Sequence, residues 1–193
     1  MGSHWGHDKV YQKAKSEGYR SRAAYKLLEI QRRFAVIRRS DNVVDLGAAP
    51  GSWLQVARAL TDGRVVGIDL SPIPPIVGVE TIEGDLADTA IQAQVKTKLG
   101  VVNVIVCDAA PRLSGHKSYD QARAMALGEE ALRFACNTLK PGGNFVVKSF
   151  QGADFSTLYS ETKRHFHSVK TCITQATRKG STELYIIGKN FIS

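Results

Sequence analysis

The sequence predicts an α/β protein built on a mostly parallel, doubly wound sheet. Strand-like apolar runs alternate with helix-like segments, several runs end in a carboxylate, and a small-residue turn joins the first run to a helix. With 193 residues, 43% of them hydrophobic, the chain is long enough for one domain with a substantial core. We expect a single domain over residues 1–193, with a polar, partly mobile segment at 1–20 and the core at 21–193.

The stretch from Val43 to Trp53 organises the chain. Two β-branched residues lead into Asp45, a turn of small residues follows, and residues 53–60 have helical character. Gly47 and Gly51 would let the backbone approach a ligand where a Cβ would collide. A nucleotide-like ligand is expected at the carboxyl end of this strand, where open α/β sheets place their sites. The turn lacks the Lys-Ser/Thr of a P-loop and is not a GxGxxG motif, and the alternative is an ordinary strand-turn-helix corner.

The rest of the chain continues this alternation. Expected strands cover residues 64–69, 79–82, 101–107, 144–149, 169–174 and 183–188. Expected helices cover residues 21–34, 87–99, 118–139 and 154–166. The last two strands form an adjacent hairpin, so we expect one strand of the sheet to be antiparallel.

Three carboxylates stand at the ends of expected strands. Asp69 lies 69 − 47 = 22 residues beyond Gly47, about the distance at which a βαβ unit presents a carboxylate to a ribose diol. Asp85 follows the next strand and suits the adenine or its surroundings. Asp108 ends a central apolar strand and precedes small residues and Pro111, a pattern more typical of a site than of a core.

Two lysines occupy informative positions. Lys148 follows the apolar run Phe145–Val147, and burying an ammonium is costly unless it is paired. The alternative is that its charged end reaches solvent. Lys26 lies near the middle of the amphipathic, basic helix expected over residues 21–34, where a lysine is usually a surface residue.

Positive charge is concentrated near the start of the sequence. The net charge is +8, and residues 1–40 hold ten Lys or Arg against three acidic residues, 10 − 3 = +7. This asymmetry indicates a polyanionic partner, because Lys and Arg gain affinity by releasing counterions condensed on phosphates. A solvated basic helix and an anionic membrane surface are the alternatives.

Signals for membrane insertion, secretion and metal binding are missing from the sequence. No apolar run approaches the ~20 residues that span a bilayer, and no secretory signal is visible. Cys107, Cys136 and Cys172 are far apart and show neither zinc nor disulfide spacing. His165 and His167 have no third ligand at metal spacing. We expect a cytoplasmic protein without a metal site.

Seven short motifs follow one another along nearly the whole chain, from about Ser21 to Phe191. They are Ser21-Arg22-Ala23 leading to Lys26, Asp45-Leu46-Gly47-Ala48-Ala49-Pro50-Gly51 with Trp53, Gly84-Asp85, Asp108-Ala109-Ala110-Pro111, Leu139-Lys140-Pro141-Gly142-Gly143, Val147-Lys148-Ser149-Phe150-Gln151-Gly152, and Glu183-Leu184-Tyr185. Together they resemble the FtsJ/RrmJ-type RNA 2′-O-ribose methyltransferases. The resemblance implies a Rossmann-like methyltransferase dependent on S-adenosylmethionine, with a mostly parallel seven-stranded sheet, one antiparallel strand and helices on both faces.

The resemblance also implies which residues form the site. The family carries a Lys-Asp-Lys-Glu tetrad, and the matching catalytic positions are Lys26, Asp108, Lys148 and Glu183. The expected cofactor-binding residues are Gly47, Gly51, Trp53, Asp69, Asp85, Leu86 and Asp108. The family usually has Gly-Gly before the Trp, where this chain has Gly51-Ser52, and we expect Ser52 to be tolerated as the first residue of the helix.

The implied reaction is methylation of a ribose 2′-hydroxyl in large-subunit ribosomal RNA, at a uridine. We expect Lys148 to act as general base, Asp108 to orient it, and Lys26 and Glu183 to support substrate positioning. The implied partner is RNA, either free rRNA or the assembled large ribosomal subunit, with no obligate protein partner and no membrane. RNA is expected to lie across the basic N-terminal helix and the turn at Arg178 and Lys179.

Three alternatives remain at this point. The same family includes tRNA anticodon-loop 2′-O-methyltransferases, although Asp108–Pro111 and Ser149–Gly152 look more like the rRNA branch. A non-catalytic RNA-binding ribosome assembly factor is a second alternative, but such a protein has no need of Lys148. A base or small-molecule methyltransferase is the third, and a base N-methyltransferase more often has an Asn/Asp-Pro-Pro-aromatic loop after the fourth strand.

Overall fold

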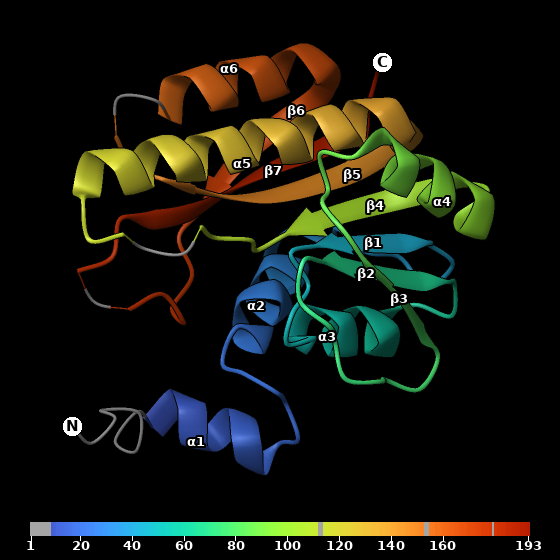
Figure 1. The fold of residues 1–193 in the computed structure, drawn as a ribbon, viewed down its shortest axis with the longest axis horizontal. Coiled ribbons are helices and arrows are strands. Elements are labelled where there is room, and N and C mark those ends of the chain that lie inside the picture. Colours follow the sequence, from blue (N-terminus) through green and yellow to red (C-terminus); the bar gives the residue numbers. More distant parts are fainter. Residues whose placement is uncertain (1–8, 112–113, 153–154, 179) are drawn as a thin grey trace.

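A single sheet lies between two layers of helices in the computed structural model (Figure 1). The structure describes residues 9–111, 114–152, 155–178 and 180–193. The strands are β1 Val43–Leu46, β2 Val65–Asp69, β3 Val79–Glu83, β4 Val102–Cys107, β5 Leu139–Phe150, β6 Phe166–Cys172 and β7 Glu183–Phe191. The helices are α1 Lys9–Ser16, α2 Ala24–Phe34, α3 Ser52–Leu60, α4 Thr89–Leu99, α5 Lys117–Thr138 and α6 Phe155–His165.

The seven strands are ordered β3-β2-β1-β4-β5-β7-β6. All neighbouring pairs are parallel except the two that involve β7, which runs antiparallel to β5 and to β6. The predicted fold class, with its one antiparallel strand, is therefore confirmed. Since β1 to β5 are parallel, their carboxyl ends meet at one edge of the sheet, and the beginning of β7 joins them there because Glu183 pairs with Phe150.

Helices cover both faces of the sheet, and each face has its own apolar core (Figure 1). One core packs α4, α5 and α6 against the sheet, with Val95, Phe134 and Leu158 among its buried residues. The other packs α2 and α3 against the opposite face, with Leu27 and Trp53 among its buried residues. The central strands are buried on both faces, as parallel strands in such sheets usually are.

Several boundaries differ from the predicted ones for local reasons. The helix expected from residue 21 begins at Ala24, because the Ser21 hydroxyl accepts a bond from the backbone N–H of Ala23 and holds a turn there. Lys26 therefore lies in the first turn of α2, not near its middle. β5 begins at Leu139, not residue 144, because Leu139 already pairs with Val102 and the register shifts before the next pair.

The N-terminal polar stretch contains a helix that its sequence did not predict. Residues 9–16 form α1, and Ala14 in it is fully buried. The division of the chain into a partly mobile segment at 1–20 and a core at 21–193 stays a prediction. Within the described ranges, no helix is both long and apolar enough to cross a membrane, and Cys107, Cys136 and Cys172 are free thiols.

Candidate functional site

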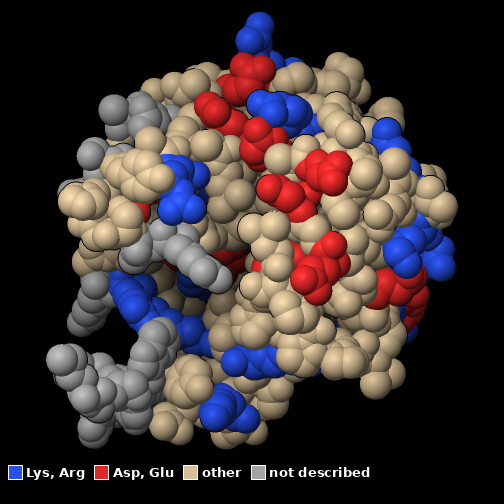
Figure 2. Space-filling view, viewed as in Figure 1, with Lys and Arg blue, Asp and Glu red and all other residues tan. Residues whose placement is uncertain are grey.

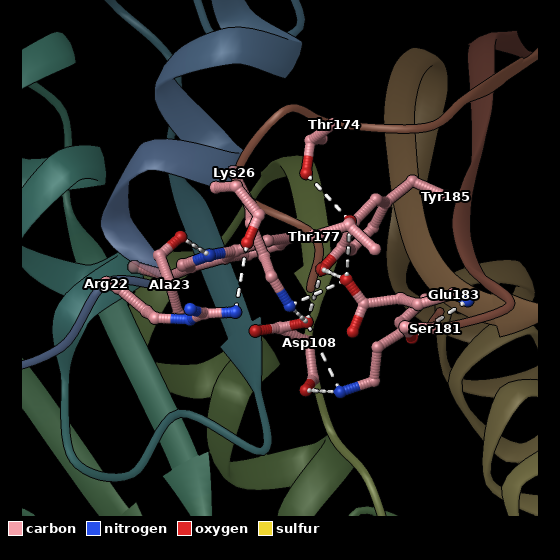
Figure 3. Close-up of polar contacts among 12 residues, drawn as sticks. Arg22, Ala23, Lys26, Asp108, Thr174, Thr177, Ser181, Glu183 and Tyr185 are labelled. Atoms are coloured by element: carbon pink, nitrogen blue, oxygen red, sulfur yellow. Dashed lines mark hydrogen bonds and ion pairs between the residues drawn. The ribbon is translucent and has the colours of Figure 1, made fainter. Parts of the chain in front are cut away.

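Four ionic side chains from four elements meet at the carboxyl edge of the sheet. Lys26 comes from α2, Asp108 directly follows β4, Lys148 lies near the end of β5, and Glu183 begins β7. In Figure 3 the side chains of Lys26, Asp108 and Glu183 point toward a common centre. The structure therefore brings together all four residues predicted as a tetrad.

The two lysines and two carboxylates form a connected set. Lys26 Nζ lies 2.7 Å from Glu183 Oε1 and 3.8 Å from Asp108 Oδ1. Lys148 Nζ lies 3.3 Å from Asp108 Oδ1 and donates a hydrogen bond of 2.6 Å to the backbone carbonyl of Asp108. Asp108 thus contacts both ammonium groups, whereas the Glu183 carboxylate pairs with Lys26.

The four side chains are largely withdrawn from solvent. Their exposed fractions are 11% for Lys26, 16% for Asp108, 7% for Lys148 and 12% for Glu183. Burial alone would raise the pKa of Glu183, but the charge and hydrogen bond of Lys26, with smaller contributions from Lys148 and Thr177, hold its pKa below the usual value. The expectation that Lys26 is a surface residue, drawn from the helix pattern alone, is wrong because two carboxylates compensate its buried charge.

Tyr185 is a central member of the site to which sequence reasoning assigned no role, although it ends one of the seven motifs. Its hydroxyl donates to Asp108 Oδ1 at 2.6 Å and lies 3.3 Å from Glu183 Oε1. Burial and the neighbouring carboxylates raise the pKa of Tyr185 well above its usual value, so the hydroxyl stays protonated and acts as a donor. The ring lies 5.7 Å from Lys26 Nζ and 5.7 Å, centroid to centroid, from the Trp53 ring. Tyr185 therefore links the two carboxylates to the core.

The segment between β6 and β7 supports Glu183 from the other side (Figure 3). Thr177 Oγ1 donates to Glu183 Oε1 at 3.1 Å and lies 3.1 Å from Thr174 Oγ1. Arg22 donates a hydrogen bond of 3.2 Å to the backbone carbonyl of Ala176, which ties this segment to the residues before α2. Arg178 lies in the same segment, while Lys179, predicted to contact RNA with it, falls outside the described residues.

The predicted ligand loop between β1 and α3 requires glycine, but partly for a different reason than expected. Gly47 and Gly51 have φ angles of 69° and 106°, in the region that disfavours other residues. A Cβ at Gly47 would collide with Ala109, and one at Gly51 would come within 2.7 Å of the Arg20 guanidinium. The glycines are therefore required by neighbouring parts of the chain itself, not only by close approach of a ligand.

The other predicted cofactor residues lie around this loop, with two exceptions in side-chain orientation. Asp69 accepts hydrogen bonds from the backbone N–H groups of Ala49 and Ser71 at 2.9 and 2.8 Å, which fixes its carboxylate beside the loop. Asp85 is exposed at the end of the neighbouring β3. The exceptions are Leu86, whose side chain is buried in the core, and Trp53, whose indole N–H donates to the carbonyl of Ala23 at 2.8 Å. These two side chains stabilise the protein around the site.

Ser52, where this chain departs from the family pattern, is the first residue of α3 as predicted. Its buried hydroxyl lies 2.7 Å from the hydroxyl of Ser21. This bond connects the loop to the segment that leads into α2. Ser52 therefore makes a contact that a glycine at this position could not make.

Arg20 is a second residue whose role sequence reasoning missed. Its guanidinium donates to the carbonyls of Pro50, Pro74 and Pro75 at 2.7, 2.8 and 2.8 Å. Its backbone N–H donates to Gln55 Oε1 at 2.9 Å. One arginine thereby holds together the loop between β1 and α3, the proline-rich loop between β2 and β3, and the N-terminal segment.

Asp45, at the base of the loop, has an unusual environment. Both of its carboxylate oxygens are fully buried and lack a hydrogen-bond partner among the described residues. Burial, followed by the charges of Asp108 and Asp69, raises the pKa of Asp45 well above its usual value. Asp69 and Asp108 thus disfavour a charge on Asp45, and the pair of carboxylates beside the loop favours a positively charged ligand.

Comparison with known proteins shows the family to which the chain belongs. The FtsJ-like methyltransferase family matches residues 19–191, which include every residue of the site described above. The chain belongs to this family. The family resemblance predicted from the seven motifs is therefore confirmed, and this FtsJ-like protein is a methyltransferase.

Similar proteins extend over nearly the whole chain. A ribosomal RNA large subunit methyltransferase E from Methanoregula boonei is 71% identical and covers 99% of both chains. A protein of the same name from Methanosarcina mazei is 51% identical over 96% of this chain and 70% of its own length. A crystal structure of a Plasmodium falciparum protein, assigned as a ribosomal RNA methyltransferase, superposes with a TM-score of 0.80 at 29% identity, over 91% of this chain and all of the other.

FtsJ-like methyltransferases use S-adenosylmethionine, and the loop region fits that cofactor. S-adenosylmethionine carries an ammonium and a sulfonium, and the carboxylates of Asp69 and Asp108 beside the loop suit such a cation. Its ribose has a diol, for which the fixed carboxylate of Asp69 is a chemically apt acceptor. Of the predicted cofactor residues, those that lie at or beside the loop with a free face toward it, and that would hold the cofactor, are Gly47, Gly51, Asp69, Asp85 and Asp108; this assignment stays a prediction.

The unusual state of Asp45 gives a prediction for stability. An unfolded Asp titrates near ~3.9 while the folded group stays neutral to higher pH, so its contribution to stability falls as pH rises between these two pKa values. In the Asp45→Asn variant this contribution is absent. We expect the free energy of unfolding of the variant, relative to wild type, to increase by on the order of 1–3 kcal/mol from pH 4 to pH 7.

Urea unfolding of the cofactor-free proteins at several pH values measures this difference. Other titrating groups affect both proteins alike and cancel. A difference that stays constant over this pH range would show that Asp45 titrates normally.

Arg20 gives a prediction for cofactor affinity. Arg20→Ala removes three hydrogen bonds that hold the loops on either side of the cofactor region. We expect the dissociation constant of S-adenosylmethionine to increase about three- to tenfold, with kcat at saturating cofactor little changed. Isothermal titration calorimetry measures the affinity, and Arg39→Ala, which removes an exposed ion pair with Asp62, is the matched control. Equal affinities for Arg20→Ala and wild type would refute this role.

Proposed function

We propose that this methyltransferase transfers the methyl group of S-adenosylmethionine to a ribose 2′-hydroxyl of large-subunit ribosomal RNA. The observation that carries the proposal is the position of Lys148. Its amine is nearly buried at the carboxyl edge of the sheet, and it is held by the carboxylate and the carbonyl of Asp108 next to the cofactor loop. A buried lysine fixed in this way suits removal of a proton from a poorly acidic nucleophile.

Lys148 is the proposed general base of the reaction. S-adenosylmethionine, when bound, supplies a methyl group activated by a sulfonium. Lys148 in its neutral form takes the proton of the 2′-hydroxyl as the O–CH₃ bond forms and the S–CH₃ bond breaks.

The remaining residues hold the acceptor and the base in place. Asp108 orients Lys148 through its carboxylate and carbonyl oxygens, and Tyr185 fixes the Asp108 carboxylate by its 2.6 Å hydrogen bond. The Lys26–Glu183 pair stands beside them and is placed to position the nucleotide. Because the methyl donor is already activated, alignment of this kind is the main contribution expected from the protein.

Large-subunit rRNA is favoured over tRNA as the substrate by the names of the similar proteins. Relatives from several archaea, 50–71% identical, are named as methyltransferases of large-subunit ribosomal RNA. The 2′-hydroxyl as the acceptor is favoured by the tetrad, since base methylation does not require a buried lysine base.

The distribution of charge favours a path for RNA from α1 to the tetrad. In Figure 2 basic side chains gather at the lower left, over α1 and the segment that leads to α2, beside a hollow in the surface. Acidic side chains gather elsewhere on this face, over the centre and the top of the view. Phosphates bound along the basic part would bring a ribose to Lys26 and Lys148.

Incorporation of a labelled methyl group tests the substrate. Methyl-labelled S-adenosylmethionine is incubated with unmethylated large ribosomal subunits and, separately, with unmodified tRNA, using wild type and Lys148→Ala. We expect label in the rRNA of the subunits, at a uridine, and none with the variant. Label in tRNA alone would overturn the substrate, and absence of label in both, with cofactor still bound, would favour a non-catalytic assembly factor.

A further inference from the structure

A small cavity lies on the opposite side of β5 from the tetrad. Gln121 and Ala124 from α5, Ser149, Phe150 and Gly152 at the end of β5, and Phe155 at the start of α6 line it. Successive residues of a strand point to opposite faces, so Lys148 faces α2 while Ser149 faces this cavity under α5. The cavity and Lys148, the proposed general base, therefore lie on opposite faces of β5 near the same end of the strand.

The lining combines flat apolar surface with polar groups. The Phe155 ring stacks on Tyr159 with centroids 5.5 Å apart, which holds it in place at the cavity. A Cβ at Gly152 would lie 3.7 Å from the Gln121 amide nitrogen, so this amide stands over the backbone at the mouth. Gln121 and Ser149 make no side-chain hydrogen bond to another residue in the described part of the chain. An amide and a hydroxyl beside an aromatic ring are typical of sites for unstacked nucleobases.

The size of the cavity is consistent with one edge of a small heterocycle. Its volume is about 80 Å³, and by this kind of measure one water requires roughly 10–15 Å³. An enclosed cavity that binds benzene has a volume of roughly 150 Å³. This cavity therefore takes in one edge of a small heterocycle and leaves the rest of the ring at its mouth. It reaches the surface at Gly152, which is exposed next to the tetrad edge of the sheet.

We propose that this cavity binds a nucleobase of the substrate RNA, next to the nucleotide whose ribose faces Lys148. The inference rests on the proposed function, because it requires RNA at the tetrad. A nucleobase placed here would stack on the Phe155 ring and form a hydrogen bond with the Gln121 amide. It would fix the register of the strand and hold the RNA locally unpaired, as a reactive ribose requires. It also gives a role to Ser149-Phe150-Gln151-Gly152, the part of its motif that the tetrad leaves unused.

Two substitutions test the cavity in different ways. Ala124→Phe fills it, and Gln121→Ala removes the amide while leaving the space. We expect the KM for unmethylated large subunits to increase about tenfold or more with Ala124→Phe and about fivefold with Gln121→Ala. The dissociation constant of S-adenosylmethionine stays near the wild-type value in both. Gln94→Ala, the same change at an exposed position of α4, is the matched control, and thermal unfolding checks that each variant is folded.

Abasic RNA tests whether the cavity holds a base. RNA oligonucleotides that span the methylated ribose, each with one base removed, are bound to wild type and to Ala124→Phe in the presence of S-adenosylhomocysteine. We expect one abasic position to weaken wild-type binding about tenfold, and the same position to have no effect on Ala124→Phe. Equal losses in both proteins, or no sensitive position in wild type, would overturn the inference.

The outcomes separate this inference from the proposed function. If wild type methylates a ribose and both variants keep the wild-type KM, the cavity is not a base site while the proposed function stands. If wild type methylates no ribose of any RNA, the proposed function fails and the base site fails with it.

Discussion

Lys148→Ala is expected to lower the rate of methyl transfer by a factor of about 10²–10⁴. The variant lacks the amine that accepts the 2′-hydroxyl proton, and no other side chain of the tetrad is placed to replace it, because the second ammonium, Lys26, is 2.7 Å from Glu183 and committed to that pair. Single-turnover incorporation of labelled methyl groups into large subunits measures the rate. Affinity for S-adenosylmethionine is expected to remain near wild type, since the cofactor loop lies outside the contacts of Lys148.

The control for Lys148→Ala is the removal of a lysine that lies outside the site. Lys170→Ala, at an exposed position of β6, makes the same chemical change elsewhere and is expected to retain full activity. If Lys148→Ala loses cofactor affinity and activity together, Lys148 has a structural role or a role in cofactor binding. If it loses neither, the general base is another group.

Asp108→Asn is expected to reduce kcat by a factor of about 10². The amide keeps an oxygen that can accept the Tyr185 hydrogen bond, but it has no charge to compensate Lys26 and Lys148. Both ammonium groups are nearly buried, so the variant leaves them with less compensation and disturbs the orientation of the base. We also expect the free energy of unfolding to fall by about 1–3 kcal/mol.

Steady-state kinetics with saturating cofactor and urea unfolding measure these two effects. Asp62→Asn is the matched control, because its partner Arg39 is exposed and the pair contributes little to stability. A value of kcat within about fivefold of wild type would mean that Asp108 does not orient the base.

Much of the fold could be predicted because its signals are local. The apolar run at residues 101–107 and the stretch at Val43–Trp53 carry strand, turn and helix signals within a few residues of one another. Helix and strand limits were less predictable. α2 starts at Ala24 because of a turn bonded through Ser21, and β5 starts at Leu139 because of pairing with Val102, and neither contact has a pattern in the neighbouring sequence.

The tetrad was predicted from the order of family motifs, not from physics alone. The helix pattern placed Lys26 on the surface, and only the fold brings Glu183 to within 2.7 Å of it. The same limit explains why Tyr185 and Arg20 were missed. The Tyr185 hydroxyl meets a carboxylate 77 residues away in sequence, and Arg20 bonds to carbonyls 30 to 55 residues away. Contacts between distant segments become visible once the strand order is known.

The position of the transferred methyl group tests the central claim most directly. Large subunits methylated by wild type with labelled S-adenosylmethionine are stripped of protein, and their rRNA is hydrolysed completely with alkali. Alkaline cleavage requires a free 2′-hydroxyl, so a 2′-O-methylated nucleotide remains joined to its neighbour. The account predicts that the label appears in an alkali-resistant dinucleotide. Label released in single nucleotides would place the methyl group on a base and contradict the role proposed for Lys148.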